Sequence, residues 1–431
     1  MTASNPARWQ SSPAHFRATS IAVIGVSVAL LFRIPAMLVI STPFAFVAIW
    51  SASSRPGTEP SLVGRLGQTT LREGEATTWS GTVSNVSEID HVVALAPRRA
   101  WLESRPASGV VTTGVRGHDT TASVSIAMRS THWGHHDLGP INIVAVSSWG
   151  AFRWKTLDIG HSVTTLPLPV VFDTSPSAHR GNGLVGLNRS TRPGDGTEFS
   201  GLRPFRTGDR LRRINWRRSL RSDELYVTAT HADQDIHVAL FVDAIADFGP
   251  SEGVDGAASS LDTAVRAAGA IAEHFLLRGD RVSLRIFGSR GRTNVPPASG
   301  RAHLRRILDV LSSIEPDISR SVGGRQGAIP ADALAIMLSP LVSPLALEWA
   351  ISIASHGLSV AVVDTLPDDV HMDDDRTTEL AWRIRLLERR REIRAVQQVG
   401  VPVAAWTGPG SLDPFLREIA RRASAPRMAR R

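Results

Sequence analysis

Residues 194–227 read GDGTEFSGLRPFRTGDRLRRINWRRSLRSDELYV and form the most distinctive stretch of this chain. Arginines alternate there with aromatic and acidic residues, and Tyr226 is the only tyrosine of the chain. Arginine forms paired hydrogen bonds with carboxylates or phosphates and stacks on aromatic rings. The stretch is therefore either a polar connector whose charges pair internally or a surface that recognises a partner. The residues concerned are Asp195, Glu198, Arg203, Phe205, Arg206, Asp209, Arg210, Arg212, Arg213, Trp216, Arg217, Arg218, Arg221, Asp223 and Glu224.

The local chemistry alone favours internal pairing, because the acids lie close enough in sequence to satisfy the arginines. Asp209 and Glu198 are the expected partners of Arg212 or Arg213, and such pairs would clamp two domains together. On a recognition surface the arginines would instead bind acidic groups, with Trp216 as a packed anchor. The two roles are compatible. The residues predicted for them are Glu198, Arg203, Arg206, Asp209, Arg212, Arg213, Asn215, Trp216, Arg217 and Arg221.

Several positions of the stretch form a series, namely Gly196, Glu198, Phe199, Leu202, Arg203, Arg206, Gly208, Asp209, Arg212, Arg213, Ile214, Asn215, Trp216, Ser219, Arg221, Glu224, Leu225 and Val227. This series resembles the signature of the domain of unknown function 58 family. So many agreeing residue types in one short window make chance agreement a poor explanation. Phe205 stands where the family usually has tyrosine, and Leu220 where it usually has alanine; both changes are mild.

The resemblance implies a membrane-anchored, non-enzymatic bacterial protein with a von Willebrand factor A-like domain. Such proteins are typically paired with a MoxR-type AAA+ ATPase and often with a transglutaminase-like membrane protein. The molecular role of the family is largely unassigned. The resemblance therefore implies more about architecture than about activity.

The composition indicates a globular chain of several domains. Its 431 residues predict two or three domains, and 42% hydrophobic residues can form a sizeable core. The formal net charge is +8, and Lys155 is the only lysine. A chain rich in arginine and poor in lysine is typical of a GC-rich genome, so its basic charge is weak support for a nucleic-acid partner.

Absent residues exclude several enzyme classes. The chain has no cysteine, which excludes disulfides, thiol nucleophiles and thiolate zinc sites. Lys155 follows Trp154, so the chain has no P-loop, and any ATP hydrolysis must come from a partner. Neither the Gly-x-Ser-x-Gly elbow nor the His-Glu-x-x-His helix motif is present.

Two apolar runs near the N-terminus predict a transmembrane hairpin. A polar segment, residues 1–17, precedes the hairpin at residues 18–50, in which Arg33 separates two uncharged runs. Each run is slightly shorter than the roughly 20 residues that cross a bilayer comfortably. Arginines before and after the hairpin place both flanks, and hence the soluble domains, on the cytoplasmic side of the inner membrane. A cleaved signal peptide is one alternative, which the second apolar run argues against, and a buried hairpin of a soluble protein is the other, less favoured one.

Residues 61–169 predict a small antiparallel β domain, a sandwich. Short segments rich in Val, Thr and Ser alternate there with Gly, Pro and Asn. The run from His132 to Asp137 contains three imidazoles, but we interpret it as a loop or strand edge because other spaced ligands are lacking nearby. The expected strands are 76–83, 92–96, 122–128, 141–146 and 162–166.

The segment 170–235 carries the signature, and residues 236–422 alternate between strand and helix patterns. This alternation predicts a doubly wound parallel sheet, whose ligands collect beyond the carboxyl ends of the strands. The expected strands are 237–242, 281–287, 333–338, 358–363 and 401–406, and the expected helices 261–277, 301–314, 344–355, 377–396 and 412–422.

We predict no metal ion at this sheet. The adhesion-site motif implied by the resemblance, Asp-x-Ser-x-Ser, is replaced by Asp243-Ala244-Ile245-Ala246-Asp247. A hard divalent cation needs several oxygen ligands, and Ile245 supplies none. At the later strand, the family's Ser-Asp is replaced by Ser339-Pro340. The acids at 368, 369 and 373–375 are interpreted as a solvated loop, because EF-hand spacing is absent.

Two basic segments lie near the C-terminus. Residues 383–394 predict an amphipathic helix with one face on the sheet, and we favour this over a membrane or nucleic-acid contact. The basic tail, residues 423–431, fits a protein near anionic lipid.

The expected function is that of a membrane-tethered interaction protein without catalytic residues or cofactors. The implied MoxR-type AAA+ ATPase would act with it in assembly or remodelling of cell-envelope complexes. One alternative is nucleic-acid binding through the Arg/Trp cluster, which the interleaved acids disfavour. Another is a hydrolase that uses Asp195, Glu198 and Asp209, which would require two carboxylates facing one pocket.

Overall fold

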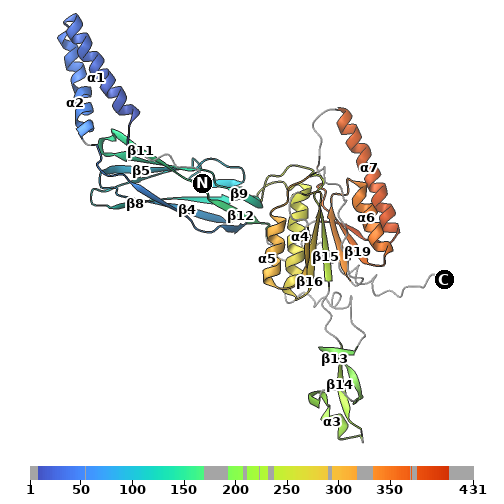
Figure 1. The fold of residues 1–431 in the computed structure, drawn as a ribbon. Coiled ribbons are helices and arrows are strands. Elements are labelled where there is room, and N and C mark those ends of the chain that lie inside the picture. Colours follow the sequence, from blue (N-terminus) through green and yellow to red (C-terminus); the bar gives the residue numbers. More distant parts are fainter. Residues whose placement is uncertain are drawn as a thin grey trace. The chain divides into compact units, whose positions relative to one another are not determined.

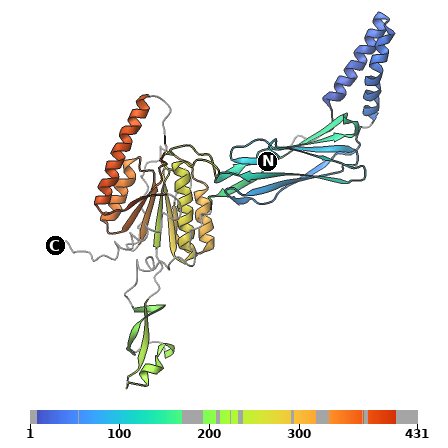
Figure 2. The ribbon, with the colours of Figure 1, turned by 180° about the vertical axis from the view of Figure 1, so that it is seen from behind.

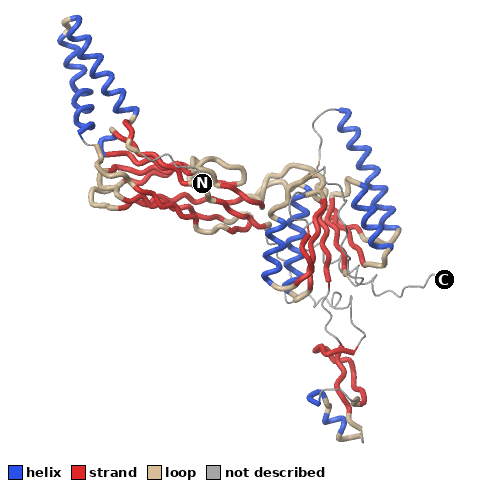
Figure 3. Tube along the Cα trace, in the orientation of Figure 1, coloured by secondary structure: helices blue, strands red, loops and turns tan. Residues whose placement is uncertain are grey.

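The computed structural model describes residues 8–53, 55–168, 193–206, 211–222, 224–231, 237–289, 294–317, 333–368, 370 and 376–406. The chain divides into two compact units. The first comprises Met1–Leu168 and Gly253–Asp255, and the second comprises Pro169–Glu252 and Gly256–Arg431. Figure 3 shows two helices and then strands in the first unit, and mixed helix and strand in the second. We describe each unit by itself.

The first unit begins with a hairpin of two apolar helices, α1 (Pro13–Phe32) and α2 (Pro35–Ser53) (Figure 1). Both are long and apolar enough to cross a membrane. α1 begins before the expected residue 18, because the Ser12 side chain caps it by accepting the His15 N–H at 3.1 Å. Arg33 ends α1 in the left-handed conformation, with φ of 52°, and so reverses the chain between the helices.

The base of the hairpin is bound to the β domain of the same unit. Strand β1 (Gln10–Ser11) pairs with β11 (Phe152–Asp158), and the His15 ring stacks on Phe152 with centroids 5.9 Å apart. His15 Nδ1 also lies 2.9 Å from the Ser51 hydroxyl. Residues 10–17, expected to be part of a polar N-terminal segment, therefore belong to the strand and helix that join these two parts.

The β domain has the sandwich-like arrangement that the sequence predicts. One sheet has the order β1-β11-β10-β5-β7, a second has β2-β4-β8-β6, and a third, small sheet has β3-β12-β9. All pairings are antiparallel except β12 with β3. The bounds are β2 (Ser61–Leu66), β3 (Thr70–Arg72), β4 (Ala76–Ser84), β5 (Ile89–Leu95), β6 (Leu102–Arg105), β7 (Val110–Gly114), β8 (Thr121–Ser130), β9 (Gly134–Asp137), β10 (Ile141–Ser147), η1 (Ser148–Gly150) and β12 (Ser162–Leu166).

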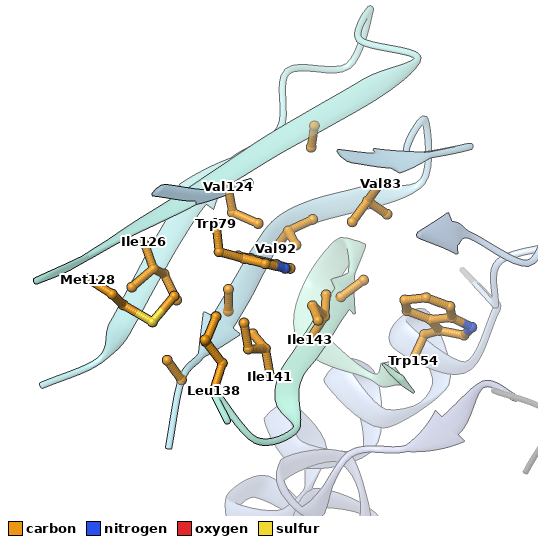
Figure 4. Packing of buried hydrophobic residues seen from close by; sticks show 14 of the residues in the cluster. Trp79, Val83, Val92, Val124, Ile126, Met128, Leu138, Ile141, Ile143 and Trp154 are labelled. Carbon is orange, nitrogen blue, oxygen red and sulfur yellow. The ribbon is translucent and has the colours of Figure 1, made fainter. Parts of the chain in front are cut away.

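Alternating side chains of these strands form the core shown in Figure 4. β4 buries every second residue, and fully buried Trp79 lies among Ile126 and Ile141. Burial of each such side chain stabilises the fold by about 1.5–3 kcal/mol. The Trp79 indole N–H is satisfied by Asp158 Oδ2 at 2.7 Å. A Cβ at Gly81 would lie 2.4 Å from the Trp79 ring, so glycine is required there.

The signature folds into a small element that we call the signature module. It consists of β13 (Pro193–Pro204), η2 (Leu211–Arg213), α3 (Trp216–Ser219) and β14 (Tyr226–His231). β13 and β14 form an antiparallel ribbon, with irregular register near Phe199. The fragment between the strands folds back on β14, because Ile214 forms a β-bridge with Val227.

The rest of the second unit forms a six-stranded sheet with the order β17-β16-β15-β18-β19-β20. Among the described residues, four helices flank the sheet; Figure 2 shows α4 and α5 on one side of it and α6 and α7 on the other. This alternation follows the doubly wound pattern. The bounds are β15 (His237–Asp243), α4 (Ser260–Leu277), β16 (Arg281–Phe287), β17 (Asn294–Ala298), α5 (Arg301–Leu311), β18 (Leu334–Ser339), α6 (Pro344–Ser355), β19 (Ser359–Asp364), α7 (Arg376–Gln398) and β20 (Val403–Ala405).

The sheet differs from the prediction at one edge. β17 is antiparallel to β16, so the sheet is not wholly parallel as expected. β17 contains Pro296 and Pro297, which lack N–H donors and so are tolerated at an edge. The remaining expected strands and helices occur with small shifts of their ends, except the helix expected at 412–422, which lies outside the described residues.

Candidate functional site

The signature module is organised by a few buried or half-buried residues. Ile214 and Val227 are buried where they bridge, and the Asn215 N–H donates to the Tyr226 carbonyl at 2.8 Å. The Ser219 hydroxyl donates to the Asn215 carbonyl at 2.9 Å and accepts the Tyr226 N–H at 2.9 Å. These bonds join α3 to the start of β14. Asn215 and Ser219 are therefore structural residues of the module.

Asn215 also begins α3. Its side chain accepts the Arg218 N–H at 3.1 Å, which satisfies one of the free donors of the first turn. The helix contains only four residues, and Asn215 before it and Ser219 at its end are both bonded to Tyr226 of β14, while Trp216, Arg217 and Arg218 between them are exposed. The module thus presents Trp216, Arg217 and Arg218 on a short, fixed turn.

The outward side of the module combines apolar and basic groups. Trp216 is 60% exposed and Leu220 is 83% exposed, and Leu211 and Leu225 are also exposed. Buried apolar surface drives folding, so this many exposed large apolar side chains on a small element indicate a binding surface. The exposed Arg217, Arg218 and Arg221 surround them, and the Arg218 guanidinium lies 5.8 Å from the centre of the Tyr226 ring. We call the exposed residues Trp216, Arg217, Leu220 and Arg221 of α3 and the turn after it the outward face.

The predicted site residues lie in different surroundings. Trp216, Arg217 and Arg221 lie on the outward face, whereas Asn215 is part of the scaffold. Arg203 and Arg213 are half-buried, and Arg206 is exposed. Asp209 lies outside the described residues, as do the side chains of Glu198 and Arg212, which belong to β13 and η2. The expected clamp of Glu198 or Asp209 with Arg212 or Arg213 therefore remains a prediction, as does a hydrolase role for Asp195, Glu198 and Asp209.

A second polar cluster lies at the carboxyl edge of the sheet, formed by the ends of β15, β18 and β19. The buried Asp243 ends β15, and its carboxylate accepts the Ser339 hydroxyl at 2.6 Å and the Ile245 N–H at 3.1 Å. Burial raises the pKa of Asp243 above its usual value of 3.8, and these two bonds partly oppose the shift. Asp247 accepts the Ser260 hydroxyl at 3.0 Å and the Leu261 N–H at 2.9 Å, and thereby caps α4. Both acids of the altered motif are thus engaged by internal donors.

At the next strand end, an arginine from α7 occupies the edge. The buried Arg389 donates through Nε to the Pro340 carbonyl at 2.9 Å and through Nη2 to Asp364 at the end of β19. Burial raises the pKa of the Asp364 carboxyl, and the charge of Arg389 opposes this shift. Open α/β sheets usually bind ligands at this edge, but here a guanidinium of the chain itself neutralises the carboxylate.

Sequence reasoning missed the role of Arg389. It lies within a run of arginines that includes Arg390 and Arg391, and composition does not distinguish the buried one from its exposed neighbours. Helical spacing is the available signal, because Trp382, Arg389 and Val396 recur every seven residues and are the buried residues of α7. The role of Ser219 was also missed, although it belongs to the matched series.

Histidines of the β domain make bonds within that domain. His136 Nε2 lies 2.7 Å from the His132 carbonyl, and His135 Nδ1 lies 2.9 Å from the Thr164 hydroxyl. Burial lowers the pKa of His136. Within the ranges that the structure describes, no group of three or more His, Asp or Glu side chains is arranged to hold a metal ion.

Comparisons with known proteins place the signature in a family. Residues 201–380, which run from β13 into α7, match the model described as "Protein of unknown function DUF58". The chain is 29% identical over 198 residues to uncharacterized protein Rv1480 of Mycobacterium tuberculosis and to uncharacterized protein Mb1516 of Mycobacterium bovis. The matched region covers 42% of this chain and 59% of each relative, which is less than two thirds of their length. Residues 201–380 are thus similar to the DUF58 family, in agreement with the signature residues.

Proposed function

We propose that this protein is a membrane-anchored, non-enzymatic interaction protein whose outward face binds an acidic surface of a MoxR-type AAA+ ATPase. The exposure of Trp216 carries the proposal. Exposed Trp216 beside exposed Leu220 forms an apolar patch rimmed by arginines, which is typical of interaction sites, and tryptophan and arginine dominate the energetic centres of protein interfaces.

The local scaffold supports a docking role over a purely internal one for these residues. Trp216, Arg217 and Arg221 make no contribution to the bonds among Ile214, Asn215, Ser219, Tyr226 and Val227 that hold the module together. Exposed guanidinium groups around an apolar centre complement an acidic surface with an apolar pocket. The family resemblance supplies the identity of the partner, and ATP hydrolysis would belong to that partner.

The two apolar helices support anchoring in the inner membrane. Their length and hydropathy suit a bilayer, and arginines flank the hairpin on both sides, which favours a cytoplasmic location for the soluble parts. When the six strands from β15 to β20 are numbered 1 to 6 along the chain, their order across the sheet is 3-2-1-4-5-6, and the edge strand β17 is antiparallel. This arrangement is compatible with a von Willebrand factor A-like domain. In this proposal the pair assembles or remodels envelope complexes, and a transglutaminase-like membrane protein is a further candidate partner.

Affinity purification tests the proposal. The tagged full chain is purified from native membranes in mild detergent beside Trp216→Ala and Trp149→Ala variants, and co-purifying proteins are identified by mass spectrometry. Trp149 is a matched control, because it is also an exposed tryptophan but lies in the other unit. We expect a MoxR-type ATPase with the native chain and with Trp149→Ala, and its loss from Trp216→Ala.

Retention of the ATPase by Trp216→Ala would reject the outward face as its docking site. A nucleic acid that binds the native chain with steep salt dependence, and is lost with the same variant, would instead favour the second function class.

A further inference from the structure

Helix α7 is held against the sheet by one face. Trp382 is buried and stacks on Phe248 with centroids 5.6 Å apart, and its indole N–H donates to the Val370 carbonyl at 3.1 Å. Arg385 donates to the Val342 carbonyl at 2.7 Å, and Arg389 donates to Pro340 and Asp364. These contacts set the rotation of α7 about its own axis. The opposite face must therefore point away from the sheet.

That opposite face is apolar in its middle. Leu380, Ile384 and Leu387 are 51%, 58% and 63% exposed, and their spacing of four and three residues aligns them on one side of the helix. Exposed arginines continue the same line, with Arg376 one turn before Leu380 and with Arg391 and Arg394 after Leu387. We call these six residues the outer stripe. The nearby acids are partnered, since Glu379 pairs with Arg383 and Glu388 pairs with Arg385.

We propose that the outer stripe binds the surface of an anionic lipid bilayer. In this arrangement the three apolar side chains enter the boundary between headgroups and acyl chains, and the arginines at both ends contact lipid phosphates. A helix with arginines beside an exposed apolar line has the composition of interfacial membrane helices. Arginine also retains its charge and hydrogen-bonds phosphate through two donors at once.

The features of the chain favour lipid over other occupants. The last 11 residues contain Arg421, Arg422, Arg427, Arg430 and Arg431 and no acid, so like charge opposes their binding to the stripe. A second copy of α7 would bring the same arginines together. Nucleic acid would contact the arginines but leave three apolar side chains without a role.

This inference rests on the membrane anchoring proposed above, because a tether at the N-terminus raises the local concentration of the stripe at the bilayer. Lipid contact here is additional to the hairpin and involves a different unit of the chain. Binding of the outer stripe would bring the α/β sheet to the membrane surface. The content of anionic lipid in the facing leaflet would then control how strongly the stripe binds.

Site-specific fluorescence labelling tests the proposal. Because the chain contains no cysteine, a single introduced cysteine can be labelled without first removing native ones. The full chain carrying Leu387→Cys labelled with bimane is reconstituted in neutral phosphatidylcholine vesicles and in vesicles that also contain phosphatidylglycerol. Acrylamide quenching measures the aqueous exposure of the label. Arg305→Cys, an exposed position on α5, provides the reference label.

We expect the Leu387 label to be shielded several-fold more on the anionic vesicles, while the Arg305 label stays equally exposed on both. The variant Arg376→Gln/Arg391→Gln/Arg394→Gln should lose this shielding, because each arginine near an anionic surface contributes roughly fivefold to binding. High salt should have the same effect.

Equal quenching of the Leu387 label on both vesicles would overturn the inference. Shielding in detergent without lipid that grows with protein concentration would also overturn it, because a second copy would then cover the stripe. Flotation with neutral vesicles separately reports the hairpin. A chain that floats but keeps an exposed label contradicts only this inference, whereas a chain that does not float with neutral vesicles contradicts the anchoring.

Discussion

The carboxyl edge of the sheet and the signature module use arginine and tryptophan in opposite ways. At the edge, Trp382 is buried against Phe248, and Arg389 is buried against Asp364. In the module, Trp216 and Arg217 are exposed on a four-residue helix. Both regions contain the same residue types in helices rich in arginine.

The difference shows that burial depends on what each helix packs against. α7 has 23 residues and lies on a six-stranded sheet, whose strand ends offer carbonyl and carboxylate acceptors. α3 lies on a two-stranded ribbon, which can cover only one side of a short helix. The edge therefore stabilises the fold, and the outward face is available to a partner.

The strongest test of this comparison replaces the buried arginine. Arg389→Met leaves the half-buried Asp364 carboxylate without its cation, so the free energy of opening α7 should fall by up to about 3–5 kcal/mol. Hydrogen exchange of peptides from α7 and β19 measures this local stability. Arg390→Met, at an exposed neighbour, is the control and should change it by less than about 0.5 kcal/mol. Similar exchange in both variants would contradict a clamping role for Arg389.

The same tryptophan substitution should have different effects in the two regions. Trp382→Ala removes a buried ring from between α7 and Phe248 and should destabilise the second unit by about 3 kcal/mol. Trp216→Ala removes an exposed ring and should change stability by less than about 0.5 kcal/mol. Thermal unfolding in detergent compares the two variants. A large loss of stability in Trp216→Ala would mean that the outward face is covered within the chain.

A smaller effect is expected inside the module. Ser219→Ala removes the acceptor for the Tyr226 N–H and the donor to the Asn215 carbonyl, and should destabilise the module by about 1–3 kcal/mol. Faster amide exchange at Tyr226 would report this loss. Ser222→Ala is the control, because its hydroxyl donates to the Arg218 or the Glu224 carbonyl, both of which lie outside β14. Unchanged exchange at Tyr226 in Ser219→Ala would show that other contacts hold the module.

The pH dependence of stability tests the internal bonding of Asp243. Its raised pKa means that the folded state binds the proton more tightly than the unfolded state. The stabilisation of the folded state by protonation of Asp243 is therefore complete below pH 3.8 and is lost as pH rises through the folded-state pKa. Asp243→Asn removes this dependence and preserves an acceptor for Ser339. The native chain should therefore lose stability relative to Asp243→Asn between acid and neutral pH. Asp309→Asn, at an exposed position on α5, should not show this trend.

Sequence patterns predicted most elements of the α/β sheet. Its buried strands are continuous apolar runs, as in 334–339, where every residue is buried, and such runs are visible without structural information. β17 was missed because Pro296 and Pro297 argue against a strand unless its position at an edge is known. The start of α1 was missed because the hydropathy of residues 13–17 is low, whereas the cap at Ser12 and the contact of His15 with Phe152 extend the helix.

The candidate site was predicted in outline. The arginine and tryptophan composition and the family resemblance identified the stretch, but not which side chains point outward. That assignment depends on bonds between residues seven to eleven positions apart, such as those of Ser219 and Asn215 with Tyr226. Nothing in the local composition separates the buried Arg389 from the exposed Arg390.

The sequence by itself determined the apolar hairpin, the alternation of strands and helices and the similarity of residues 201–380 to the DUF58 family, because hydrophobic periodicity and short-range residue order are properties of the chain alone. The tertiary structure decided which polar groups are satisfied internally and which remain exposed. Asp243 and Asp364 find their partners only when the ends of three strands and one face of α7 come together. The outward face and the outer stripe exist because the opposite sides of α3 and α7 are already occupied.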